Sequence, residues 1–276
     1  VSIDSFAALE QQSAHHTAIL PPTVFFEMAL EAGAERLKTD NLMLFEVEIK
    51  KPLAIEDEDR IRLQLVLTEE GGKVCKFAIY CMPAATKNNE WIKHCTGRII
   101  ESDSSEVIRF VEKETGDLTE LKQRMASNLS NDIIKNDYYQ FARELGFASN
   151  FKAVETFWST HGEALGKIQL DSRWDSDDHV IHHGLIDGGI QVLWAAHLGD
   201  HSDMEYMPVG TERVMILARE KLSYTQPIWI HVKIVNPSNN DKQFANMHVL
   251  TDQGERVADF HHIALKKIKR RTRLLH

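Results

Sequence analysis

The same order of elements is predicted twice along the chain, and this duplication constrains the fold more than any other feature. In the first half, Pro22 to about Leu37 has apolar residues at helical spacing and a proline suited to a first turn. Strand-like segments follow at Leu42–Ile49, Arg60–Leu67, Lys73–Tyr80 and Trp91–Ile100. The stretch Glu69–Lys73, with two adjacent glycines, is expected to form a hairpin turn.

The second half repeats this order, beginning with an apolar segment from about Leu185 to His197 that is expected to be a helix. Strands are predicted at Val209–Leu217, Ile228–Val235, Ala245–Leu250 and Val257–Ile268. A helix followed by an antiparallel meander, twice over, predicts an α+β fold in which each helix is wrapped by a sheet. We expect the two units to lie side by side with their sheets joined.

A polar segment separates the two units. Residues 1–101 are assigned to the first unit, residues 102–145 to a connection, and residues 146–276 to the second unit. The connection opens with an acidic linker, Ser102–Asp117, and continues with apolar residues at helical spacing over Leu118–Leu145.

Composition excludes several classes of protein. A net charge of −9 argues against a general nucleic-acid or anionic-membrane binder. Basic residues do gather at 266–273, which we interpret as a solvated tail or a linker to another domain. No apolar run approaches the roughly 18 residues of a membrane span, and no signal peptide is recognised.

The three cysteines, Cys75, Cys81 and Cys95, lack CxxC spacing and are odd in number. They are interpreted as reduced packing residues of a cytoplasmic protein, and no metal site is predicted. The chain has neither a glycine-rich nucleotide loop nor a GxSxG nucleophile elbow. No nucleotide cofactor is therefore expected.

The stretch His182–Gln191 sets two polar groups in an apolar segment. Asp187 and Gln191 are four residues apart, so on a helix they stack one turn apart on the same face. Asp187 is expected in the first turn, where exposed amides and the helix dipole act on a carboxyl group. An ordinary buried helix with an acidic residue near its start is the alternative interpretation.

This stretch also resembles the His-Pro-x-x-x-Asp-x-x-x-Gln signature of polyketide synthase dehydratase domains. His182, Asp187 and Gln191 match the signature, and His183 stands in place of its proline. Three further segments resemble that family in the correct order. Leu20–Leu30 is similar to its Pro-Gly-x-x-Tyr-x-Glu-Met-Ala segment, Trp91–Gly97 to its Trp-x-x-His-x-x-Gly strand, and Met207–Arg213 to the strand after its second helix. The resemblance implies a double hotdog fold.

Two motifs of that family are altered here. Its N-terminal motif, His-x-x-x-Gly-x-x-x-x-Pro, would place a histidine at Gln12 if Pro21 is the motif proline. The available histidines are instead His15 and His16, which are either moved into place by a shorter loop or are exposed loop residues. The family's Gly-Tyr-x-Tyr-Gly-Pro-x-Phe loop is reduced to Gly146–Phe151, which implies a reshaped substrate tunnel.

The resemblance implies removal of water from a β-hydroxyacyl thioester carried on the phosphopantetheine of an acyl carrier protein. In that reaction His15 or His16 is the base at the α-carbon and Asp187 the acid at the β-hydroxyl. Gln191 is an orienting hydrogen-bond partner, and Gln191, His182, Pro21 and Gly146 are the candidate substrate-binding residues. The carrier protein, an adjacent ketosynthase or other synthase domain and a second copy of the chain are the expected partners.

Two other functions remain open. Dehydratase-like domains in such assembly lines also shift double bonds, form oxygen heterocycles by conjugate addition, or assist chain branching. The shortened loops favour such changed chemistry, whereas the retained Asp187 argues against a pure double-bond shift. The third possibility is a scaffold that holds the carrier protein or dimerises the module without catalysis.

Overall fold

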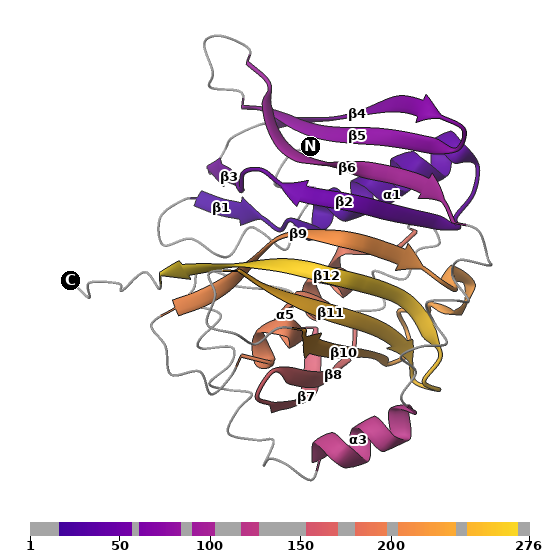
Figure 1. Ribbon diagram of the computed structural model, residues 1–276, viewed down its shortest axis with the longest axis vertical. Helices are drawn as coiled ribbons and strands as arrows, with labels where there is room; N and C mark the ends of the chain where they lie inside the picture. Colours follow the sequence, from indigo (N-terminus) through magenta and orange to yellow (C-terminus); the bar gives the residue numbers. More distant parts are fainter. Residues whose placement is uncertain are drawn as a thin grey trace.

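A ten-stranded antiparallel sheet runs through the computed structural model, which describes residues 17–56, 61–83, 90–102, 117–126, 153–170, 180–197, 204–235 and 242–269 (Figure 1). Its strand order is β4-β5-β6-β2-β9-β12-β11-β10-β8-β7. The first unit supplies β2 (Leu42–Ile49), β4 (Ile61–Gly71), β5 (Val74–Pro83) and β6 (Ile92–Glu101). The second supplies β7 (Val154–Thr160), β8 (Glu163–Ile168), β9 (Met204–Ile216), β10 (Ile228–Ile234), β11 (Lys242–Thr251) and β12 (Arg256–Lys269).

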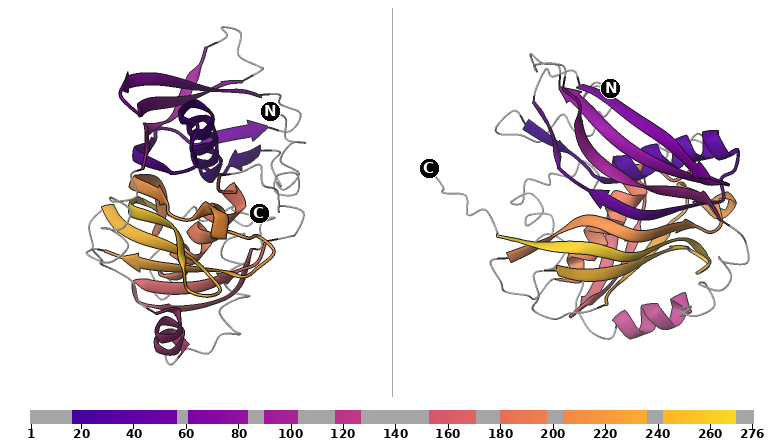
Figure 2. Two further views of the ribbon diagram at one scale, coloured as in Figure 1. Left: turned by 90° about the vertical axis from the view of Figure 1, so that its right-hand side faces the viewer. Right: turned by 45° about the horizontal axis from the view of Figure 1, so that its top comes forward.

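Each unit holds one long helix against this sheet (Figure 2). Helix α1 (Thr23–Leu37) contacts the strands of the first unit, and α5 (His183–Ala195) contacts those of the second. The two helices also pack against each other, and a single apolar cluster includes both helices and the sheet residues beneath them. The architecture is therefore the double hotdog that the duplicated pattern and the resemblance predict.

The opposite face of the sheet is covered in part by α3 (Leu118–Ala126), which packs on β7 and β8. Side chains alternate between faces along a strand. Gly166 of β8 accordingly faces Val192 of α5, while its neighbour Leu165 belongs to a separate apolar cluster with Leu121 and Met125 of α3.

Most predicted elements are present, with shifted ends. Helix α3 occupies the start of the predicted helix Leu118–Leu145, and residues 127–145 lie outside the described residues. Strand β9 begins before Pro208 rather than after it. The sequence did not predict β7 and β8, nor the small sheet of β1 (Thr17–Leu20) and β3 (Leu53–Glu56), nor the short 3-10 helix η3 (Arg219–Lys221). Cys75, Cys81 and Cys95 are buried free thiols.

In the part of the chain that the structure describes, no helix is both long and apolar enough to span a membrane. The division into residues 1–101, 102–145 and 146–276 stays a prediction. The two units meet where β2 pairs with β9. The paired residues run from Met43 opposite Met215 to Glu48 opposite Gly210.

This junction requires a residue without a side chain at Gly210. A Cβ atom there would lie 2.3 Å from the Val47 carbonyl oxygen, and a backbone atom cannot move aside as a flexible side chain can. We expect Gly210→Ala to lower the free energy of unfolding by about 1–3 kcal/mol, as overpacking does elsewhere. The exposed Glu48→Ala, on the paired strand, is the matched control and should cost less than about 0.5 kcal/mol. Equal stabilities of the two variants in denaturant titration would contradict a tightly packed junction.

Candidate active site

The start of α5 is fixed by the side chain and backbone of His182. His182 is the N-cap residue, and its Nδ1 accepts a hydrogen bond from the Gly184 backbone N–H at 3.0 Å. Its own backbone N–H donates to the Tyr224 hydroxyl at 2.8 Å. Burial raises the pKa of Tyr224 to about 12, so this hydroxyl stays neutral at physiological pH. The candidate substrate-binding residue His182 thus has a structural task at the helix terminus.

Asp187 lies in the second turn of α5 and not in the first. The expectation that it lies in the first turn is wrong, because the helix begins at His183 rather than near Leu185 and its first turn holds no acidic residue. Because the helix begins at His183, the three residues His183, Asp187 and Gln191, each four apart in sequence, all lie on one face of α5.

The Asp187 carboxyl group is held in a poorly solvated environment. Gln191, whose side chain is almost completely buried, donates from Nε2 to Asp187 Oδ2 at 2.9 Å. Burial raises the pKa of Asp187 to about 6, against the opposing effects of the Gln191 hydrogen bond and the His183 charge. The side chain nevertheless keeps partial exposure. A carboxyl group with this pKa exchanges a proton readily near neutral pH.

Glu27 of α1 reaches across to the beginning of α5. Its Oε2 lies 2.5 Å from His183 Nδ1, and both side chains are buried, with exposed fractions of 11% and 9%. Glu27 lies within Leu20–Leu30, the segment that resembles the family, but no role was predicted for it from the sequence. The match to a glutamate in that motif was the available signal.

The remaining candidates are less completely placed. Pro21 lies two residues before the first residue of α1, and its carbonyl oxygen accepts a hydrogen bond from the Val24 N–H at 3.1 Å. His15, His16 and Gly146 lie outside the described residues, so their distances to Asp187 stay untested. Among the residues that the structure describes, no group of three histidine, cysteine or acidic side chains could hold a metal ion.

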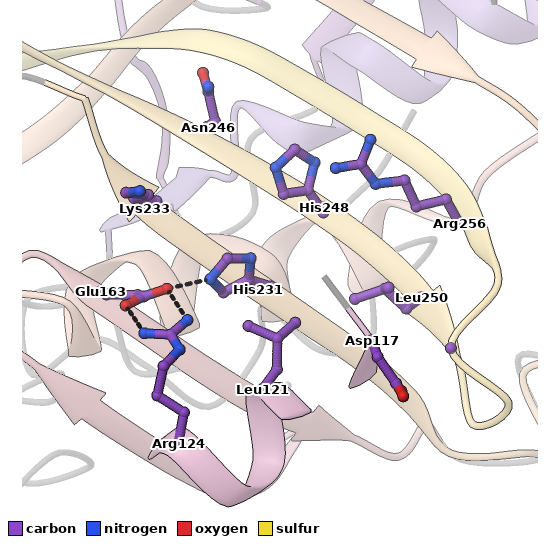
Figure 3. A pocket seen from close by; sticks show the side chains of 11 residues that line it. Asp117, Leu121, Arg124, Glu163, His231, Lys233, Asn246, His248, Leu250 and Arg256 are labelled. Carbon is purple, nitrogen blue, oxygen red and sulfur yellow. Dashed lines mark hydrogen bonds and ion pairs between the residues drawn. The ribbon is translucent and has the colours of Figure 1, made fainter. Parts of the chain in front are cut away.

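A separate cavity of about 450 Å³ opens on the other face of the sheet, beside α3 (Figure 3). Arg124 forms two hydrogen bonds to Glu163, at 2.6 and 2.7 Å, and His231 lies 2.7 Å from the same carboxylate. These contacts hold the pKa of Glu163 well below its ordinary value. Beside them, His248 bonds to the buried Asp259. Glu163 is thus paired with two other residues that line the cavity, and the cavity contains none of the predicted site residues.

Comparison with known proteins identifies the family. The family model described as the polyketide synthase dehydratase N-terminal domain matches residues 114–274, more than half of the chain. A second model, described as the polyketide synthase dehydratase domain, matches residues 1–82. The chain belongs to the polyketide synthase dehydratase family.

Solved structures share the fold of this dehydratase domain. The dehydratase domain from the CurK module of the curacin polyketide synthase is 22% identical, with a TM-score of 0.79 over 98% of this chain and 90% of that one. A trans-AT dehydratase domain from Brevibacillus brevis is 18% identical, with a TM-score of 0.77 over 95% and 90%. A comparison with curated proteins gave no match.

The position of Asp187 predicts a pH-dependent cost to stability. Its pKa is raised from 3.8 in the unfolded chain to about 6, so the folded protein binds more protons between these values and stability falls as the pH rises through this window. We expect Asp187→Asn to be more stable than the wild type at pH 8 by on the order of 1–2 kcal/mol, allowing for partial exposure, and to keep only a small part of that advantage at pH 4, close to the pKa of the unfolded chain.

Thermal unfolding at the two pH values measures this difference. Asp40→Asn, at an exposed position, controls for the chemical change itself. A stability gain that is the same at both pH values would show that ionisation of Asp187 does not lower the free energy of unfolding.

Proposed function

We propose that this dehydratase domain removes water from a β-hydroxyacyl chain held as a thioester, with Asp187 as the acid. The observation that carries the proposal is the Asp187 carboxyl group itself, with a pKa raised to about 6 and Gln191 bonded to one of its oxygens. The reaction needs a donor that gives a proton to the leaving β-hydroxyl group. A carboxylic acid stabilised in its neutral form by poor solvation is suited to that task.

The base at the α-carbon is proposed to be His15 or His16. The described histidines closest in sequence to Asp187 are engaged elsewhere, since His182 caps α5 and His183 bonds to Glu27. The motif position of His15 and His16 before Pro21 supports their assignment. The CurK dehydratase offers a parallel, because a histidine-to-phenylalanine and an aspartate-to-asparagine variant of it are each described as inactive mutants.

The substrate is proposed to be carried on the phosphopantetheine of an acyl carrier protein, and the domain to need no cofactor of its own. Gln191, His182, Pro21 and Gly146 are retained as proposed substrate-binding residues, with His182 acting through the helix terminus. An adjacent ketosynthase or other synthase domain and a second copy of the chain are the proposed partners. Buried free thiols support a reducing, cytoplasmic setting.

Mass spectrometry of a carrier-bound β-hydroxyacyl substrate tests the acid. Wild-type protein is expected to give the product that has lost water, and Asp187→Asn to lose at least about a hundredfold in rate, because an amide cannot donate the required proton. Asp40→Asn should keep the wild-type rate. Full turnover by Asp187→Asn would remove Asp187 from the mechanism, and no turnover by the wild type would favour the scaffold function.

The same assay separates a second candidate function. The shortened loop at Gly146–Phe151 favours changed chemistry, such as conjugate-addition cyclisation, a double-bond shift or chain branching. Cyclisation and a double-bond shift convert an unsaturated substrate without a change of mass, so the products are separated by chromatography before mass spectrometry, whereas branching adds mass from a second acyl group. A domain that leaves the β-hydroxyacyl chain intact but converts the unsaturated one would overturn the dehydratase proposal.

The two histidines can be told apart by single substitution. If one of them takes the α-proton, its replacement by asparagine should abolish exchange of the substrate's α-hydrogen with deuterated solvent, and replacement of the other should leave exchange within about threefold. Exchange that persists in both single variants and in the double variant would show that neither histidine is the base.

A further inference from the structure

The first residue of α5 is joined to the other unit at a position where the family signature has proline. His183 directly follows the N-cap residue His182, and its Nδ1 lies 2.5 Å from Glu27 Oε2 of α1. The rings of His182 and His183 stack, with centroids 4.4 Å apart and planes 25° from parallel. The helix terminus therefore carries a buried imidazole bonded to a carboxylate.

Two more contacts fix the segment that leads into α5. Glu31, one turn after Glu27 on α1, accepts a hydrogen bond from the Val180 backbone N–H. The Tyr224 hydroxyl accepts one from the His182 N–H. With the Glu27–His183 pair, these contacts bind residues 180–183 to both α1 and the segment after η3. A shift of α1 would thus move the start of α5.

The spacing of residues along α5 connects the Glu27–His183 pair to Asp187. Residues four apart on a helix are neighbours on its surface. His183 stands one turn before Asp187, and Gln191 stands one turn after it and donates to the Asp187 carboxyl group. We propose that Glu27 and His183 are positioning residues: Glu27 holds the His183 imidazole beside Asp187, and this placement sets how readily the Asp187 carboxyl group gives up its proton.

A test must separate the effect of His183 on Asp187 from the effects of the other charged and titratable groups around these two residues. The groups concerned are His183 on α5 itself, Glu27 and Glu31 on α1, and Tyr224 with its neighbour Arg219 beyond β9. His183 is the one that lowers the pKa of Asp187 through its charge, against the larger effect of burial. The proposal rests on the function assigned to Asp187, but its central measurement needs no substrate.

Two substitutions at His183 keep the local fold by different means. His183→Gln retains a hydrogen-bond donor toward Glu27 but cannot carry a charge. His183→Pro installs the residue of the family signature at the first helical position, where proline is favoured, and the preceding His182 already has the extended backbone that proline requires, with φ −70° and ψ 131°. Thermal unfolding and circular dichroism establish that each variant is folded.

Carbon-13 NMR of protein labelled in its aspartate carboxyl groups gives the test, with Asp187→Asn used to assign the resonance. We expect His183→Gln and His183→Pro each to raise the Asp187 titration midpoint by about half to one pH unit, because a nearby positive charge is lost. Glu27→Gln should raise the midpoint when His183 is present, since the imidazole loses the carboxylate that holds it. In the His183→Gln background, Glu27→Gln removes only a negative charge and should not raise it.

A midpoint that does not respond to either His183 substitution would overturn the proposal. So would a Glu27→Gln shift that is the same in both backgrounds, because the two residues would then act independently. A merely structural role would lower the unfolding temperature without this dependence on background. If the midpoints shift as expected and no substrate is turned over, the proposed function fails while the coupling of Glu27, His183 and Asp187 stands.

Discussion

The pairing of β2 with β9 is the constraint on which the rest of this structure depends. It joins the strands of the two units into one antiparallel sheet, so that both long helices pack on the same side of it and against each other. Only this arrangement brings Glu27 of α1 to His183 of α5, 156 residues away in the chain. The close approach of Gly210 to the Val47 carbonyl oxygen shows how little space the junction leaves.

Within that frame, burial and hydrogen bonding act in opposite directions on one carboxyl group. Poor solvation favours the neutral form of Asp187, while the Gln191 amide and the His183 charge favour the carboxylate. The resulting pKa, about 6, lies in the range where a group can both hold and release a proton. The outer cavity differs, because Glu163 is bonded to both Arg124 and His231, and its pKa is lowered rather than raised.

The sequence predicted the elements whose residues face water on one side. Strand β4 alternates between half-buried and exposed positions, and this pattern is readable without a structure. Strand β8 was missed because α3 covers its outer face, where the apolar Leu165 is buried, while Gly166 stands in place of a large residue on the inner face. Burial on both faces removes the alternation that marks a strand.

The candidate site was predictable only in part for a similar reason. The spacing of Asp187 and Gln191 predicted their contact, because it depends on one helix alone. The helix start was placed two residues late, since Gly184 and the two histidines before it look like a loop. The partner of His183 could not be found from local pattern, because it depends on how α1 packs against α5.

A crystal structure with a non-reacting β-hydroxyacyl analogue on a phosphopantetheine arm tests the central claim most directly. The account predicts that the β-oxygen lies within about 3.2 Å of the Asp187 carboxyl group, or one water molecule away from it, as proton transfer requires. It also predicts that an imidazole from the segment before Pro21 faces the α-carbon. An acyl chain bound with its β-oxygen remote from Asp187, or seated in the cavity beside α3, would contradict the account.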